Sequence, residues 1–430
     1  MKKNIFLWSL YDFANSIIMI VFLFYFSQWL VIDSGKPDWW YNATLIISSI
    51  LFIAIAPVLG QRLDVTGKKL RGLRITSVLM TIFYIGTACV MLFAPLQAVL
   101  ATVLFTMAMF TYLLSFIYYT PMINDVANNE NRGWVSGLGL GANYIGQVFG
   151  LLITLPFATG VIHLMGAPGR AQTLMPAILL FVIAAVPMLI AYKESASLAV
   201  AEKMNIRKEY SHLRKTIVRI FSIRNLAFLF LAYFLFSDAL LTFSNNFPIF
   251  LEKVFAASDS AKTYLSAGIL ALSGVGSLIF GKVADRKGTK HTLLFILLCW
   301  VIIFPLLAFC SSFTMAIVIC LIGGIFFGPI WGVSRAMVSE YAPHELQASS
   351  FSFYTVAERF ATCIGPLTWT IVLASTASKG NASYSYAVAS MAILVLLGYI
   401  CIRKIRPAES APKESVVEEI LSEPSVTKTF

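Results

Sequence analysis

Long runs without any charged residue constrain this chain more than any other feature of its sequence. Runs free of Asp, Glu, Lys and Arg cover residues 75–124, 133–169, 171–192, 292–334 and 380–402. A helix needs about 20 apolar residues to cross the hydrocarbon core of a bilayer. Only 12% of the residues are charged, against about one quarter in soluble domains. The chain is therefore predicted to be an all-α integral membrane protein with many spans.

Charged turns and turns that contain Pro or Gly divide the chain into twelve predicted spans. The first six are 6–32, 42–61, 73–93, 97–120, 133–158 and 173–192, and the second six are 225–251, 263–282, 291–310, 313–336, 347–374 and 383–402. We expect an N-terminal six-helix half (1–192), a cytoplasmic amphipathic linker (193–224), a C-terminal six-helix half (225–404) and a disordered cytoplasmic tail (405–430). The linker could instead be a solvated basic segment without a helix.

The distribution of Lys and Arg predicts the orientation in the membrane. An even number of spans places both termini and the linker on one side, and 26 of the 32 Lys and Arg residues fall on that side. The other side has five: Lys36, Arg170, Lys253, Lys262 and Lys379. Cytoplasmic loops carry the excess of positive charge. We therefore expect a multi-pass protein of the bacterial inner membrane with both termini in the cytoplasm. The net charge of +11 then indicates contact with anionic lipids and no nucleic acid.

A short sequence occurs once in each half. Residues 60–69 read GQRLDVTGKK and residues 281–290 read GKVADRKGTK, so Gly, Asp, Gly and Lys recur at an offset of 221. Residues 124–130 (NDVANNE) and 339–345 (SEYAPHE) share Asp/Glu, Ala and Glu at an offset of 215. Both pairs lie between equivalent spans. Two repeats at similar offsets indicate that the halves arose by duplication.

These repeated loops resemble the signature G-x-x-x-D-[RK]-x-G-[RK]-[RK] of the major facilitator superfamily. The first copy has Val65 where a basic residue is usual, and the second has Thr289 at a basic position. The doubled loop, the twelve spans and the basic linker extend the resemblance over residues 1–405. It implies two pseudo-symmetric halves with a substrate site near the bilayer midplane between them.

Three segments carry a narrower resemblance. WSLYDFANS (8–16), NRGWVSGLGLGANYIGQVFG (131–150) and SRAMVSEYAPHELQASSFSFYTVAERFATCIGPL (334–367) are similar to the branch related to fungal vacuolar amino-acid effluxers, whose bacterial members are mostly of unknown substrate. The resemblance implies efflux of amino acids or similar small metabolites. The fifth span lacks the Gly-Pro-x-x-Gly-Gly element of drug/proton antiporters, so multidrug transport is the alternative.

The signature loops are predicted to gate the pathway. A carboxylate where a helix reaches the cytoplasm can cap a neighbouring helix or pair with an Arg, so Asp64 is expected to latch one state shut; the alternative is that the loops only set the topology. The candidate gating residues are Gly60, Asp64, Gly67, Lys68 and Lys69 in the first loop, and Gly281, Asp285, Arg286, Gly288 and Lys290 in the second.

Ionisable and amide side chains within the spans are the candidate substrate or proton-coupling residues, because such groups are costly in a membrane. Spans 1, 5, 7 and 11 are expected to direct these groups toward one cavity. A static ion pair within span 11 is the alternative for its two charged residues. The candidates are Asp12, Asn15, Asn143, Gln147, Asp238, Asn245, Asn246, Glu358 and Arg359.

Asp238 and Glu358 are the carboxylates predicted nearest to mid-span. Desolvation disfavours the charged form of a carboxylate, so such a group can bind a proton when its surroundings dry. Arg359 stands beside Glu358 and would hold it charged, although neighbouring residues on a helix point about 100° apart. We therefore favour Asp238 as the proton site and expect Glu358 and Arg359 to orient the substrate.

Other classes of function fit the sequence less well. The stretch GSLIFGKV (276–283) resembles a nucleotide-binding loop but has Val283 at the metal-binding position, and no HExxH or GxSxG motif indicates an enzyme. The six Cys are isolated, so no metal site or cofactor is expected. The prediction is a monomeric secondary active transporter for a small-molecule substrate, driven by a proton gradient. A channel, a scramblase or a non-transporting receptor on the same scaffold remains the alternative from another class.

Overall fold

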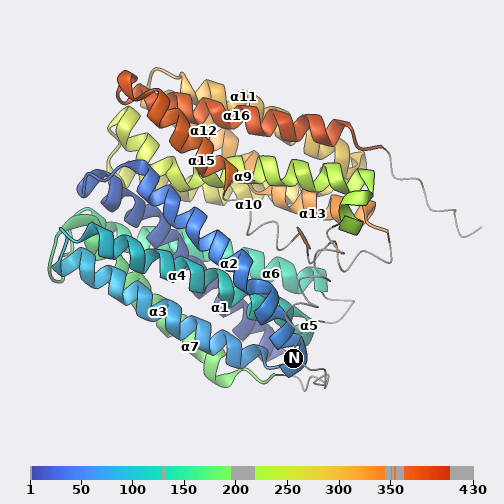
Figure 1. Ribbon diagram of the computed structural model, residues 1–430, viewed down its shortest axis with the longest axis horizontal. Coiled ribbons are helices and arrows are strands. Elements are labelled where there is room, and N and C mark those ends of the chain that lie inside the picture. Colours follow the sequence, from blue (N-terminus) through green and yellow to red (C-terminus); the bar gives the residue numbers. More distant parts are fainter. Residues whose placement is uncertain are drawn as a thin grey trace, which may run out of the picture.

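The computed structural model describes residues 2–127, 132–194, 218–343, 350, 353–354 and 363–406, without the side chains of residues 61, 64, 65, 132 and 133. These residues form helices joined by short turns, and none of them is in a strand. Figure 1 shows two helical bundles side by side, one coloured blue to green and the other yellow to red. The bundles correspond to the two predicted halves, so the all-α fold class is confirmed.

The N-terminal half is built around α1 (Lys2–Val21), which continues through two π-helical turns to Asp33. This helix packs against α6 and α7, while α4 packs against α2 and α3. The remaining helices are α2 (Asp38–Thr66), α3 (Lys69–Phe93), α4 (Ala98–Tyr119), α5 (Ile123–Val126), α6 (Arg132–Ala158) and α7 (Leu174–Ala191).

The C-terminal half repeats this plan with α9 against α16, α11 against α16, and α10 against α12. The tenth span is interrupted, because α12 ends at Phe327 and α13 begins at Pro329, a residue that removes one helical hydrogen bond and favours a kink. The helices are α9 (Arg224–Phe255), α10 (Asp259–Lys287), α11 (Thr289–Ala308), α12 (Phe313–Phe327), α13 (Pro329–Tyr341), α15 (Ile364–Ser375) and α16 (Ala382–Arg403).

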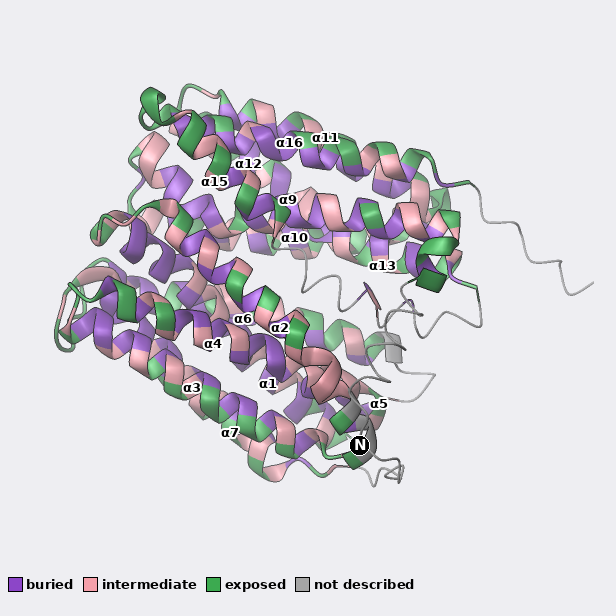
Figure 2. Cartoon of the chain, viewed as in Figure 1, coloured by how far each residue is buried: buried purple, intermediate pink, exposed green. Residues whose placement is uncertain are grey.

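Eleven helical segments among the described residues are long and apolar enough to cross a membrane. The shorter apolar helix α15 has 12 residues and coincides with the end of the predicted span 347–374. Figure 2 shows buried residues along the helix faces that meet inside each bundle, whereas α7 exposes Leu179, Ile183 and Ile190 in a stripe. An outward apolar stripe is what lipid chains would contact.

The helices give the molecule two ends, which we name by their residues. The terminus side contains Lys2 and Arg406, at the right of Figure 1. The distal side is the opposite end, where α2 begins at Asp38 and α9 ends at Phe255. The predicted linker lies mostly in 195–217 and the predicted tail in 407–430, so both fall outside the described residues.

The repeated signature loops are largely helical on the terminus side. The charges led the sequence analysis to end spans 2 and 8 at residues 61 and 282, but α2 continues to Thr66 and α10 to Lys287. Charged residues mark where a helix leaves the lipid, and a helix can continue into water. The turns themselves fall at Gly67 and Gly288, with φ of 63° and 87°, a region that glycine enters without a steric cost.

Candidate functional site: polar groups within and between the halves

Three predicted site residues form a hydrogen-bonded chain in the N-terminal half. The Asn143 side-chain nitrogen on α6 donates to Asp12 Oδ1 on α1 at 3.4 Å. Gln147 Nε2 donates in turn to Asn143 Oδ1 at 2.6 Å. All three side chains are half-buried. The structure therefore brings Asp12, Asn143 and Gln147 together on one side of the seam between the two helices.

Glycines on α6 allow that seam to close. A Cβ at Gly139 would stand 2.7 Å from the Trp8 ring and 3.5 Å from Asp12 Oδ2. A Cβ at Gly150 would stand 3.1 Å from the Ile17 backbone. Small residues let membrane helices approach closely. The close contacts at Gly139 and Gly150 therefore determine where Asn143 and Gln147 lie along α1 relative to Asp12. Asn15 lies deeper, only 2% exposed, and its Oδ1 has no hydrogen-bond partner among the residues that the structure describes.

Asp238 occupies a different environment in the C-terminal half. It is fully buried, and its Oδ2 accepts a hydrogen bond of 2.7 Å from the Gly365 backbone nitrogen. Thr242 Oγ1 donates to Asp238 Oδ1 at 3.5 Å. Gly365 lies in the first turn of α15, where backbone N–H groups lack helical partners and favour a negative charge. Asp238 on α9 therefore caps α15 from the side.

The two asparagines of α9 differ although they are neighbours. Asn246 is fully buried and exchanges hydrogen bonds with Asn42 of α2, at 3.0 Å and 3.4 Å. Asn245 is half-buried and does not take part in that pair. Asn246 thus joins the two halves, a role that its predicted place in a cavity did not suggest.

For three candidates, the structure does not describe the side chain. Glu358 and Arg359 lie outside the described residues, and so does the side chain of Asp64. The other predicted gating residues lie on the terminus side at the ends of α2 and α10. Gly60 and Gly281 are within those helices, Asp285 and Arg286 are exposed in the last turn of α10, and Lys68 is exposed just before α3.

An ionic cluster on the distal side joins the halves, and the sequence analysis did not predict it. Arg170, just before α7, donates from Nη1 to Asp33 Oδ1 at 2.7 Å within its own half. It also reaches the other half, with 2.5 Å from Nη2 to Glu252 Oε2 and 3.1 Å from Nε to Asp259 Oδ2. The Arg170 side chain is only 10% exposed. One guanidinium therefore holds three carboxylates.

Lys262 completes this distal cluster from α10. Its side chain is fully buried and its Nζ lies 2.8 Å from Asp259 Oδ1. It also pairs with Glu252 and donates to Gln28 Oε1 on the N-terminal half. From the sequence, Arg170 and Lys262 are predicted only as charges of the outer side. The carboxylate partners of Arg170 are 82 to 137 residues away in the chain, so no local pattern indicates its pairing.

Further hydrogen bonds join the halves on the same side. Tyr25 and Thr263 share a hydrogen bond of 3.1 Å between their hydroxyl oxygens. The Tyr384 hydroxyl on α16 donates to Asp38 Oδ2 at the start of α2, at 2.7 Å. The hydrogen bonds and ion pairs that join described residues of the two halves all lie on the distal side.

Between described residues, the polar contacts on the terminus side stay within one half. Lys69 Nζ lies 2.6 Å from Asp125 Oδ1, and the Thr289 hydroxyl donates to Glu340 Oε2 at 2.5 Å. Asp125 and Glu340 are equivalent positions of the second repeat. Each signature loop is therefore tied to the terminus-side end of the fourth span of its own half, by an ion pair in one half and a hydrogen bond in the other.

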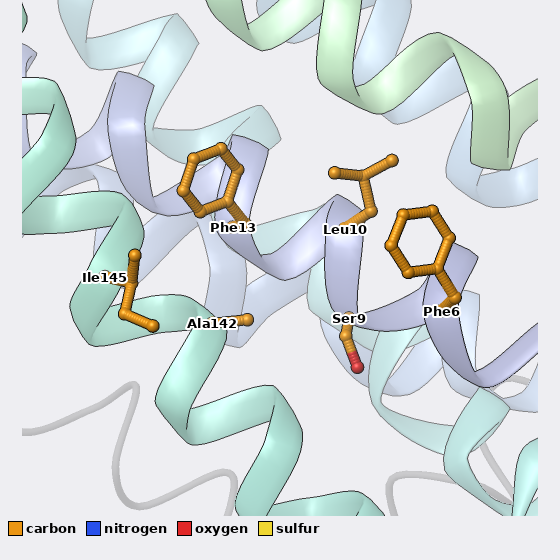
Figure 3. Close-up of a pocket in the computed structure, with 6 residues that line it drawn as sticks. All are labelled: Phe6, Ser9, Leu10, Phe13, Ala142 and Ile145. Atoms are coloured by element: carbon orange, nitrogen blue, oxygen red, sulfur yellow. The ribbon is translucent and has the colours of Figure 1, made fainter.

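An apolar hollow of about 210 Å³ lies between α1 and α6. Figure 3 shows its lining, with Phe6, Ser9, Leu10 and Phe13 from α1 and Ala142 and Ile145 from α6. Asp12, Asn143 and Gln147 do not line it. Phe6 and Ile145 are exposed on the outside of the molecule, so the hollow fits a lipid-facing groove better than a substrate site. Among the described residues, no cluster of His, Cys, Asp or Glu could hold a metal ion.

Comparisons with known proteins agree with this architecture. A sequence model of the Major Facilitator Superfamily matches residues 229–428. The chain is 24% identical over 417 residues to the uncharacterized MFS-type transporter YxiO of Bacillus subtilis (strain 168), covering 91% of this chain and 94% of that protein.

Two solved structures show the same fold at low identity. The nucleoside transporter NupG superposes with a TM-score of 0.70 at 14% identity, covering 94% of this chain and all of that one. A bacterial homolog of the human lysosomal transporter Spinster, in an inward-facing and unoccupied conformation, gives 0.69 at 12% identity, with 95% and 98% covered. The chain therefore has the major facilitator fold, and its second half matches that superfamily in sequence.

Proposed function

We propose that this protein is a secondary active transporter that moves a small polar or amphiphilic metabolite by alternating access. The observation that carries the proposal is the one-sided arrangement of polar contacts between the halves. An ionic cluster closes the distal side, while the polar contacts between described residues on the terminus side remain within each half. Two rigid halves that part on one side and meet on the other are what alternating access requires.

The proposed orientation follows from the excess of Lys and Arg on the terminus side. With both termini in the cytoplasm of a bacterium, the described state would be open inward and closed outward. The similarity to an inward-facing Spinster homolog supports that assignment. Amino acids are the first candidate substrates, moved outward, because of the resemblance to the vacuolar effluxer branch. Lipids would surround a monomer.

Proton coupling is proposed to act through Asp238. Its carboxylate is fully buried on α9 and accepts a hydrogen bond from the backbone of α15. Burial favours the neutral form and the cap favours the charged form, so a proton on Asp238 would loosen its hold on α15. Asp12, Asn143 and Gln147 would contact the substrate from the N-terminal half, and Glu358 and Arg359 from the C-terminal half.

The proposal is tested with purified protein in liposomes. A thermal-shift screen against a metabolite library identifies binders, because a ligand stabilises the folded state. The rate of counterflow of a labelled binder should then saturate as its concentration rises. Liposomes without the protein should show no counterflow. A flux that rises linearly would indicate a channel, and binding without any flux would indicate a receptor. Either result would overturn the transporter proposal.

Coupling is tested separately with Asp238→Asn, whose amide oxygen can still accept from Gly365. This variant should exchange substrate across the membrane but should not accumulate it in response to a pH gradient. Thr242→Val, which removes only the weaker hydrogen bond to Asp238, is the matched control and should retain accumulation. Gradient-driven accumulation by Asp238→Asn would exclude this carboxylate as the proton site.

A further inference from the structure

Four cations gather on the terminus side where α9 begins and α16 ends. Arg224 is the first residue of α9, Arg403 is the last residue of α16, and Lys404 and Arg406 follow it. All four side chains are exposed. None of them forms an ion pair with a described carboxylate, in contrast to Arg170 and Lys262 on the distal side. We call these four residues the basic patch.

The backbone around the basic patch is held in place. The Asn225 side chain donates from Nδ2 to the Arg406 carbonyl oxygen at 3.2 Å and accepts from the Arg406 backbone nitrogen at 3.1 Å. Lys290 Nζ donates to the Ile405 carbonyl oxygen at 2.6 Å. The end of α16 is therefore fastened to the start of α9, and the cations of both helices occupy one small area.

Two cations of the patch share one aromatic ring. The Arg224 guanidinium lies 5.9 Å from the centre of the Phe228 ring, and Lys404 Nζ lies 5.7 Å from it. A ring face attracts a cation, but one ring cannot offset the repulsion among four positive charges at low ionic strength. An anion that reaches both Arg224 and Lys404 would complete the arrangement.

The depth of the patch identifies the class of anion. Arg224 and Arg403 are the terminal residues of two candidate spans, so their charges lie where lipid phosphates lie. Leu231 follows Arg224 by two turns and is 46% exposed, and Ile400 precedes Lys404 by one turn and is 40% exposed. Residues at these spacings share a helix face. Apolar surface thus continues from the cations toward the middle of the membrane.

We propose that the basic patch binds one anionic phospholipid, with its phosphate on Arg224 and Lys404 and its acyl chains along Leu231 and Ile400. A free phosphate could use the cations but would gain nothing from the apolar surface. The site is separate from the proposed substrate pathway. It could still influence transport, because α9 and α16 carry Glu252 and Tyr384 of the distal contacts at their other ends.

Native mass spectrometry of the full chain in neutral detergent tests the proposal. Wild-type protein is titrated with phosphatidylglycerol, with phosphatidylcholine and with inorganic phosphate. We expect one phosphatidylglycerol to bind at least tenfold more tightly than phosphatidylcholine, and inorganic phosphate not to displace it. Equal binding of the two lipids would overturn the proposal. Displacement by inorganic phosphate would also overturn it, in favour of a site for a soluble anion.

Paired variants locate the site. Arg224→Gln with Lys404→Gln should abolish the preference for phosphatidylglycerol. Arg62→Gln with Arg71→Gln removes two exposed charges from the terminus side of the other half and should preserve it. Arg224→Lys with Lys404→Arg keeps both charges and should also preserve it, which separates loss of charge from misfolding. A preference that survives in the first double variant would refute the assignment to this patch.

Discussion

On the distal side, Arg170 and Lys262 join residues of different halves, whereas on the terminus side Lys69 and Thr289 each join residues of the same half. The two cations of the distal cluster are buried or nearly so, with Arg170 10% exposed and Lys262 fully buried. The two terminus-side links are separate from each other, with one in each half.

This difference explains how each half can stay rigid while the two halves move relative to each other. The links within a half hold its helices together, because they join the loop between the second and third spans to the end of the fourth span. The links between the halves can break without unfolding either unit. A buried charge that loses its partner is costly, so the distal cluster should form or separate as a whole. We expect substitutions on the two sides to have different effects.

Arg170→Ala should have the largest effect. It leaves Asp33, Glu252 and Asp259 close together with Lys262 as the remaining cation. We expect the distal-closed state to be weakened by about 3–5 kcal/mol, the range for breaking a buried ion pair; Asp33, whose side chain is 40% exposed, contributes the least. The loss is measured as a lower thermal midpoint in detergent. Arg170→Lys keeps the positive charge but lacks the several donors of the guanidinium group. Its thermal midpoint should lie between those of the wild type and Arg170→Ala. An unchanged midpoint would contradict the account.

Asn246→Ala should have the next largest effect on the distal side. It leaves the buried Asn42 amide without its partner, at a cost of about 1–3 kcal/mol. A cysteine at Thr263, a buried position on the distal side, should then react several times faster with a thiol reagent. The adjacent Asn245→Ala serves as the control and should leave the rate unchanged. Equal rates in the two variants would show that the amide pair does not hold the halves together.

Lys69→Gln tests the terminus side. Its partner Asp125 is largely buried, so we expect a loss of about 1 kcal/mol from the N-terminal half. The cysteine at Thr263 should react at the wild-type rate, because the link lies within one half. Arg71→Gln, at an exposed position in the first turn of the same helix, should have no effect on either measurement. Faster reaction in Lys69→Gln would remove the distinction between the two sides.

Thr289→Val should have the smallest effect. It deletes one exposed hydrogen bond to Glu340, worth about 0.5 kcal/mol, the low end of the usual range. Its thermal midpoint should fall by less than that of Lys69→Gln. A larger fall would mean that the hydrogen bond of the second half is the stronger brace.

Much of the architecture could be predicted from the sequence, because the membrane imposes simple rules. Charge-free runs gave the spans, and the offset of 221 residues located the equivalent turns at Gly67 and Gly288. The break between α12 and α13 falls at Pro329, which has no backbone donor. Asp12, Asn143 and Gln147 were chosen as polar groups within spans, and they lie together because their helical positions face one another.

The contacts between the halves could not be predicted in the same way. Arg170 and its partners come from four separate helix ends, and no periodic pattern specifies how the ends of two bundles meet. The capping role of Asp238 was also missed, because it depends on the start of α15, which interrupts a span that the sequence analysis treated as continuous. The roles proposed for the site residues stay predictions.

Distances between spin labels across the halves test the central claim most directly. One pair, Gln97 and Ser311, is exposed on the distal side, and the other, Thr66 and Lys287, is exposed on the terminus side at equivalent positions. Both are labelled as cysteines in a chain whose six native cysteines are replaced. We predict that Arg170→Ala lengthens the distal distance and shortens the terminus-side distance. Unchanged distances, or distances that lengthen together on both sides, would contradict the account.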